Sequence, residues 1–302
     1  MYRGRFAPSP TGPLHFGSLI AALASYVDAR ANGGEWLLRI EDVDVPRARR
    51  GSEADIVATL GRYGFAWDGP MERQSARAPR YAAALDALVA HGLAYPCACS
   101  RRDLEAAALG PGGERVYPGT CSAGPSLAKS GRRERAWRVR VGAARIEFVD
   151  RLQGAQAQDL ARDVGDFVAR RADGLFAYQL AVVVDDGAQQ VTHVVRGADL
   201  LSSTPRQIHL QRLLGLRPVS YLHVPVALDG AGLKLSKQTE AAALPHDPLP
   251  ALVAAWRFLD QPLPAAAPRT LDDFWSHAVR AWMPRRLPPL AMLPAPPVLA
   301  GV

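Results

Sequence analysis

The chain has few cysteines and no long apolar run. It contains three cysteines in 302 residues, and no apolar run reaches the roughly 18 to 20 residues that a membrane helix needs. The N-terminus lacks a basic segment followed by an apolar one, because Arg3, Arg5 and several prolines interrupt it at once. An odd number of cysteines without a signal pattern argues against a disulfide framework. We therefore expect a cytoplasmic protein rather than a membrane or disulfide-rich secreted one.

Acidic residues are fewer than basic ones. The chain has 29 Asp and Glu against 36 Lys and Arg, a formal net charge of +7. This balance favours a polyanionic partner such as nucleic acid, although a genomic preference for arginine over lysine would explain it equally. The 48% hydrophobic and 22% charged residues are ordinary for a globular protein. The length allows one large domain or two joined ones.

One stretch near the N-terminus, residues 5–18, combines three local signals. A short apolar run around Phe6 leads through a loop rich in proline and glycine into an apolar helical pattern over residues 19–27. The free N–H groups at the start of such a helix suit a phosphate or carboxylate. His15 can donate to a phosphate, and Gly17 allows a ligand to approach the backbone. The alternative is that Ser18 caps the helix and His15 is a partly buried loop residue.

A second stretch, Lys-Leu-Ser-Lys-Gln at residues 234–238, favours the first interpretation. Together the two stretches resemble the paired signatures of class I aminoacyl-tRNA synthetases, His-Ile-Gly-His and Lys-Met-Ser-Lys-Ser. The run Arg-Phe-Ala-Pro-Ser-Pro-Thr-Gly-Pro-Leu-His and the later Arg-Ile-Glu-Asp-Val-Asp look like the glutamyl branch of that family. The chain departs from the signatures at Ser18 and Gln238, whose roles stay open. The resemblance covers roughly residues 3–240.

The resemblance implies an α/β fold, a Rossmann-type parallel sheet that binds ATP. In such enzymes the amino-acid carboxylate attacks the α-phosphorus of ATP and expels pyrophosphate, so catalysis is mostly alignment and charge stabilisation. The implied catalytic residues are His15 and Lys237. The residues implied to hold ATP are His15, Gly17, Lys234 and Lys237. Magnesium is expected with ATP, but no carboxylate can be assigned as its ligand.

A glutamate pocket needs two cations for the two carboxylates and an acid for the ammonium group, and arginine suits a carboxylate well. The resemblance gives the ammonium contact to Glu41 and the closing of the pocket to Tyr178 and Arg196. The complete implied set is Arg5, Phe6, Ala7, Pro8, Ser9, Glu41, Tyr178 and Arg196. Without the family, Arg196 would be a structural ion pair and Tyr178 a core aromatic. Asp44 is interpreted as a solvated turn or a helix cap.

The three cysteines, Cys97, Cys99 and Cys121, form three quarters of a tetrahedral zinc site. The residues themselves leave the fourth ligand open among Tyr117, Asp103, Glu105 and Glu114, and three buried inert thiols are the alternative. In the glutamyl relatives that modify queuosine, a tyrosine four residues before the last cysteine fills this place. The resemblance therefore implies one structural zinc held by Cys97, Cys99, Tyr117 and Cys121.

The periodicity along the chain predicts the main elements. Residues 52–65, 79–92, 249–259 and 270–282 are expected to be helical, and a cap at 202–207 begins a further helix through Leu213. Residues 35–40, 176–186, 191–197 and 221–228 are expected to be strands, the last followed by a Gly-rich hairpin. Residues 138–141 alternate as an exposed strand would.

These elements suggest a division of the chain. We expect residues 1–94 and 176–240 to be the two halves of the catalytic domain. Residues 95–175 are expected to be a zinc-containing insertion that resembles an acceptor-binding region. Residues 241–302 are expected to be a short, Pro-rich helical region, with no anticodon-binding domain.

Three features narrow the resemblance to one group of enzymes. They are the cysteine cluster, His-Phe-Gly-Ser in the first signature and the expected lack of an anticodon-binding domain. They imply the enzymes that activate L-glutamate with ATP without tRNA and transfer it to queuosine at the wobble position of tRNA(Asp). A monomer is expected. The alternatives are a truncated glutamyl-tRNA synthetase that charges the acceptor end, and a catalytically silent RNA-binding relative. Whether glutamate activation requires tRNA separates the first of these from the main hypothesis.

Overall fold

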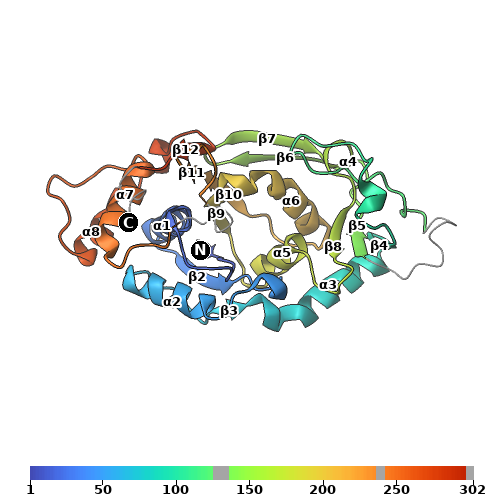
Figure 1. Ribbon diagram of the computed structural model, residues 1–302, viewed down its shortest axis with the longest axis horizontal. Helices are drawn as coiled ribbons and strands as arrows, with labels where there is room; N and C mark the ends of the chain where they lie inside the picture. The colour runs from blue at the N-terminus through green and yellow to red at the C-terminus, as the bar shows by residue number, and fades with distance from the viewer. Residues whose placement is uncertain (125–135, 236–241, 297–302) are drawn as a thin grey trace.

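The computed structural model of the chain describes residues 1–124, 136–235 and 242–296 (Figure 1). Its centre is a parallel sheet in two hydrogen-bonded parts. One part contains β1 (Arg3–Phe6), β2 (Glu35–Ile40) and β3 (Glu72–Arg73), and the other contains β9 (His193–Gly197), β10 (Ser220–Val224) and β6 (Arg145–Asp150). The parts meet where the Thr192 N–H donates to the Arg3 carbonyl at 2.9 Å. The expected parallel sheet is confirmed.

Helix α1 (Phe16–Ala31) is the core of the N-terminal half. It packs on β1 and β9 and is buried on nearly every face, because apolar residues fill most of its positions. Helices α7 (Pro248–Phe258) and α8 (Leu271–Ala281) pack against it at one end of the molecule (Figure 1). Asp247 caps α7, and Thr270 with Asp273 forms a capping box at α8. Both helices were expected from the sequence.

The remaining helices lie beside the sheet. They are α2 (Ser52–Arg62), α3 (Ala78–Ala90), α4 (Leu160–Asp163), α5 (Tyr178–Ala188) and α6 (Thr204–Leu213). Helices α2, α3 and α6 agree with the periodicity, but the strand expected over residues 176–186 is wrong, because Tyr178–Ala188 is α5. The segment is buried on all sides between α3 and α6, and an apolar run without alternation fits a buried strand and a buried helix equally.

A second, antiparallel sheet forms the opposite end of the molecule (Figure 1). It has the order β4 (Ala94–Cys97), β5 (Ala136–Val139), β8 (Phe167–Arg170). The strand expected over residues 138–141 is present as β5, two residues earlier, but its expected exposure is wrong, because β5 is the central strand and Arg138 is 8% exposed. Strand β7 (Gly154–Asp159) forms a hairpin with β6, and β11 (Val226–Leu228) pairs with β12 (Met292–Pro294).

The parallel strands determine where a ligand can bind. Chain segments that follow parallel strands leave the sheet at one edge, which is where open α/β sheets bind their ligands. The segments after β1, β2, β9 and β10 contain most of the residues singled out from the sequence. Among the described helices, none is long and apolar enough to cross a membrane.

Candidate active site

A cavity of ≈ 220 Å³ lies at this edge of the sheet. Ten of the residues predicted for glutamate, ATP or the first signature line it: Arg5, Phe6, Ala7, His15, Gly17, Ser18, Glu41, Tyr178, Arg196 and Lys234. Pro8 and Ser9 are not among the lining residues. The Pro8 carbonyl instead accepts from the Glu41 N–H at 3.0 Å, and Ser9 is exposed. The structure thus places six of the eight residues predicted for glutamate at one cavity with His15, Gly17 and Lys234.

The first signature forms one wall of the cavity. Helix α1 begins at Phe16 with His15 as its N-cap residue, so Ser18 lies inside the first turn and is not the cap. His15 is buried at 9% exposure. A Cβ atom at Gly17 would lie 3.1 Å from the His15 ring and 3.2 Å from the Leu235 carbonyl oxygen. Glycine therefore lets the first signature approach the segment that contains the second, and any side chain here would crowd the His15 ring and the Leu235 carbonyl.

The described ends of the lysine segment both lie against the first signature. Before it, the expected hairpin is present: Lys234 bridges Leu228, and Leu235 donates to the Ala227 carbonyl at 2.8 Å. After it, Ala243 bridges His15. Lys237 and Gln238 lie outside the described residues.

The Lys234 ammonium donates to the carboxylate of Asp199, which also lines the cavity. Asp199 was not predicted from the sequence. The available signal was its position two residues after Gly197, the last residue of β9, because segments that follow parallel strands lie at the ligand-binding edge. A Cβ atom at Gly197 would lie 2.4 Å from Asp199 Oδ1, so glycine makes room for this carboxylate.

Buried charges form the floor beneath Arg5. Its Nε and Nη2 atoms donate to Asp186 at 3.3 and 3.4 Å, while Arg39 approaches Asp186 at 2.8 Å and Glu41 at 3.4 Å. Burial would raise the pKa of Asp186, but the guanidinium groups of Arg5 and Arg39 outweigh it and lower this pKa. For Glu41, burial prevails over the same two arginines and raises the pKa. The ionised Asp186 carboxylate therefore partly neutralises the positive charge of Arg5 before any ligand binds.

A second buried acid, Asp185, lies next to Asp186 on α5. Its carboxylate, fully buried, accepts from Arg77 at 2.5 Å, Tyr81 at 2.7 Å and Gln74 at 3.0 Å. These contacts tie α3 and the turn before it to α5. The sequence analysis missed Asp185, Asp186 and Arg39. Two adjacent acids at the end of an apolar run were the available signal, since buried acids are rare unless they are paired.

Arg196, on β9, is held differently from Arg5. Its Nε donates to His223 Nε2 at 3.0 Å, and its Nη2 donates to Thr204 Oγ1 at 2.9 Å and Gln207 Oε1 at 2.8 Å. Its Nη1 lies 3.5 Å from the Tyr178 hydroxyl. These acceptors are side chains without negative charge. The arginine is 5% exposed, so the cavity contains a fixed guanidinium whose charge its hydrogen-bond acceptors leave uncompensated.

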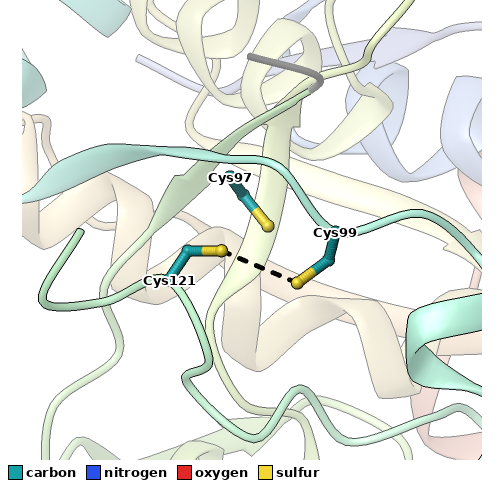
Figure 2. Close-up of side chains that lie close together, drawn as sticks. All are labelled: Cys97, Cys99 and Cys121. Atoms are coloured by element: carbon teal, nitrogen blue, oxygen red, sulfur yellow. Dashed lines mark hydrogen bonds between the residues drawn. The ribbon is translucent and has the colours of Figure 1, made fainter. Parts of the chain in front are cut away.

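The three cysteines form a compact cluster at the start of the second sheet (Figure 2). Cys97, Cys99 and Cys121 are buried, and their sulfur atoms lie within 4.8 Å of one another. The Tyr117 hydroxyl lies 3.4 Å from Cys97 Sγ and 3.9 Å from Cys99 Sγ. Of the other candidates for a fourth ligand, Asp103 accepts from Ser100, Glu114 pairs with Arg206, and Glu105 is exposed. The geometry thus favours Tyr117.

Two neighbouring residues support this cluster. Arg138 donates from Nε to Cys97 Sγ at 3.4 Å, and its guanidinium lies 3.7 Å from the centre of the Tyr117 ring. Burial would raise the pKa of the Cys97 thiol, but hydrogen bonds from Tyr117, the Cys99 backbone and Arg138 lower it. Gly165 has a φ of +71°, and a Cβ atom there would lie 2.2 Å from the Tyr117 carbonyl oxygen. Gly165 therefore leaves room for the Tyr117 backbone, and Arg138 favours the charged form of the Cys97 thiol.

Comparison with known proteins agrees with this geometry. Residues 1–247 match the family described as tRNA synthetases class I (E and Q), catalytic domain. The glutamyl-Q tRNA(Asp) synthetase of Dechloromonas aromatica (strain RCB) is 57% identical, over 97% of this chain and 99% of the relative. The protein of the same name from Burkholderia mallei (strain ATCC 23344) is 59% identical, over 93% of this chain and 96% of the relative.

Solved structures show the same fold. The crystal structure of a glutamate tRNA ligase from Elizabethkingia meningosepticum in complex with its amino acid superposes with a TM-score of 0.77. It covers 97% of this chain and 67% of that one, at 24% identity. At this identity the likeness supports the class I catalytic fold alone. The family match over residues 1–247 and the near-full-length relatives show that the chain belongs to the class I tRNA synthetase (E and Q) family and, within it, to the glutamyl-Q tRNA(Asp) synthetases.

Proposed function

We propose that the chain activates L-glutamate with ATP, without tRNA, and transfers it to the queuosine at the wobble position of tRNA(Asp). The observation that carries this proposal is one cavity that joins two buried arginines and Glu41 to the first signature and Lys234. Two cations and one acid match the charges of glutamate, and the helix start beside them matches the phosphates of ATP. The names of its relatives specify the tRNA and the modified base. We place the activity in a cytoplasmic monomer.

Each group has a role in the proposed activation step. Arg5 and Arg196 with Tyr178 bind the two carboxylates of glutamate, and Glu41 binds its ammonium group. One α-carboxylate oxygen attacks the α-phosphorus of ATP, the bond from phosphorus to the bridging oxygen breaks, and pyrophosphate leaves. His15, Gly17 and the start of α1 align the triphosphate, while Lys234 and Lys237 stabilise the charge on the leaving group. Magnesium is expected to accompany ATP.

The proposed role of Glu41 depends on two opposing effects on its pKa. Binding an ammonium group needs an ionised carboxylate, yet burial raises the pKa of Glu41. The nearby guanidinium groups of Arg39 and Arg5 oppose that effect. The arginines therefore limit how far burial raises the pKa of Glu41, which favours the ionised form that a cationic ligand needs.

We also propose that Cys97, Cys99, Tyr117 and Cys121 hold one structural zinc in the insertion over residues 95–175. Three convergent sulfurs and a phenol oxygen are a plausible tetrahedral donor set. Arg138 would offset the negative charge of the ligands, as outer-shell partners of metal sites commonly do. When bound, the zinc would cross-link β4 to the loop that contains Cys121 and would take no part in the transfer.

Metal analysis tests the zinc proposal. The purified wild-type protein should contain one zinc per chain. Tyr117→Phe removes one donor and should weaken zinc retention against a chelator at least about tenfold, since even outer-shell losses have effects of that size. Tyr95→Phe is the matched control, because the Tyr95 hydroxyl donates to Asp166 at 2.6 Å rather than to the thiols. A wild-type protein without zinc, or equal retention in both variants, would refute the assignment.

The exchange of pyrophosphate into ATP tests the proposed function. We expect exchange that depends on glutamate and proceeds without tRNA. Added tRNA(Asp) with queuosine should then accept labelled glutamate, whereas the same tRNA with an unmodified guanosine at the wobble position should not. Exchange only in the presence of tRNA would indicate a shortened glutamyl-tRNA synthetase. No exchange in either condition, with RNA binding intact, would indicate a silent RNA-binding relative.

A further inference from the structure

A chain of hydrogen bonds extends behind Arg196 across three neighbouring strands. Arg196 on β9 and His223 on β10 are register partners, and Asp150 is the last residue of β6, on the other side of β10. His223 Nδ1 lies 2.6 Å from Asp150 Oδ2, and His223 Nε2 lies 3.0 Å from Arg196 Nε. Asp150 and His223 are 2% and 0% exposed. Neither residue lines the cavity, so both can act on a ligand only through Arg196.

His223 Nε2 has two neighbours, Arg196 Nε and the Thr204 hydroxyl at 3.2 Å, and the arginine fixes the arrangement of protons because the hydroxyl can either donate or accept. Arg196 Nε is always a donor, so His223 Nε2 must accept and carry no proton. Nδ1 must then hold the ring proton and donate it to Asp150. The pKa of His223 is lowered, with burial as the largest cause, which agrees with a neutral ring. Asp150 is itself fixed, because it accepts from the backbone N–H groups of Leu152 and Gln153 at 3.0 and 2.9 Å.

We propose that Asp150 and His223 are positioning residues that orient Arg196 for the glutamate carboxylate while leaving its positive charge uncompensated. A carboxylate in direct contact would orient the guanidinium equally well but would neutralise it, as Asp186 partly does for Arg5. A neutral imidazole supplies the acceptor without the charge. This inference rests on the proposed function, because it assigns the two residues a part in binding the same substrate.

Asp150→Asn is the central test. An amide at this position can donate to His223 Nδ1, which would favour the tautomer with the proton on Nε2. That N–H would then face Arg196 Nε, which is also a donor, so the hydrogen bond between them would be lost. We expect the KM for glutamate in pyrophosphate exchange to rise roughly 10- to 100-fold, the range for losing a charged hydrogen bond. The kcat should change much less, because the contact is made in both ground and transition states.

His223→Gln is the second arm. A glutamine amide oxygen can accept from Arg196 whether residue 150 is charged or neutral. The KM of Asp150→Asn/His223→Gln should therefore equal that of His223→Gln alone, within about a factor of 3, because no imidazole remains for residue 150 to orient. If Asp150 acted only on stability, its substitution would have the same effect in both backgrounds, and that result would overturn the proposal. An unchanged KM in Asp150→Asn would overturn it too.

The tautomer of His223 can be measured in the wild-type protein independently of its activity, with a variant used only to assign the signals. Two-bond ¹H–¹⁵N spectra of the wild-type protein, with the His223 signals among the seven histidines assigned by their loss in His223→Gln, should show the Nδ1–H form. An Nε2–H form or a charged ring would overturn the proposal. If the wild type failed to activate glutamate, the proposed function would fail, while the spectra would still decide the state of His223.

Discussion

Replacing Arg196 with lysine should raise the KM for glutamate in pyrophosphate exchange by about 10- to 150-fold, since a hydrogen bond to a charged group contributes about 1.5–3 kcal/mol. Lysine keeps the charge but has a single donor group. It cannot donate to His223, Thr204 and Gln207 together and still leave a donor for a carboxylate, whereas Arg196 keeps Nη1 for that contact. The expected loss is therefore one of geometry rather than of charge.

Arg206→Lys is the matched control for this variant. Arg206 lies on α6 and pairs with the exposed Glu114 at 2.8 Å, away from the cavity. Its substitution should leave the KM for glutamate unchanged. A wild-type KM in Arg196→Lys would remove Arg196 from the proposed binding set, and an equal loss in both variants would indicate a general effect on folding. Thermal unfolding of each variant separates these cases.

Replacing Asp185 with alanine should lower the free energy of unfolding by about 3–5 kcal/mol, the usual cost of removing one member of a buried ion pair. Its carboxylate is fully buried and accepts from Arg77 and Tyr81, and Arg39 Nε lies 3.8 Å away. Without Asp185, the guanidinium groups of Arg39 and Arg77 lose a buried counter-charge. Urea unfolding followed by circular dichroism would measure the effect.

Glu147→Ala is the control for this second variant. Glu147 pairs with Arg145 at 2.8 Å, but both side chains are 65% exposed. Exposed pairs typically contribute at most about 1 kcal/mol, so this loss should be small. A change below about 1 kcal/mol in Asp185→Ala as well would mean that the buried network does not stabilise the fold as its geometry suggests.

The two signatures were recognisable in the sequence because their chemistry is local. His15 and Gly17 follow a strand and begin a helix, so their role depends on residues within a few positions of them. The same is true of Cys97 and Cys99. The amphipathic helices α2 and α3 were equally visible, because each has one apolar and one polar face.

The residues that the sequence analysis missed act over long distances along the chain. Arg39 meets Asp186, and Asp150 meets His223, only because parallel strands and α5 bring them together. Helix α5 was taken for a strand because its apolar residues face neighbours on every side, which removes the periodicity that identifies a helix.

The sequence by itself determined the family, the parallel α/β fold and the residue types of the cavity, because motifs and periodicity are properties of neighbouring residues. The tertiary structure alone decided how those charges are balanced. It pairs Arg5 with Asp186 and surrounds Arg196 with neutral acceptors, so two arginines that look alike in the sequence differ in the charge they offer a ligand. Compensation of charge in a buried site depends on distances of a few ångströms between segments remote in sequence, and only folding sets those distances.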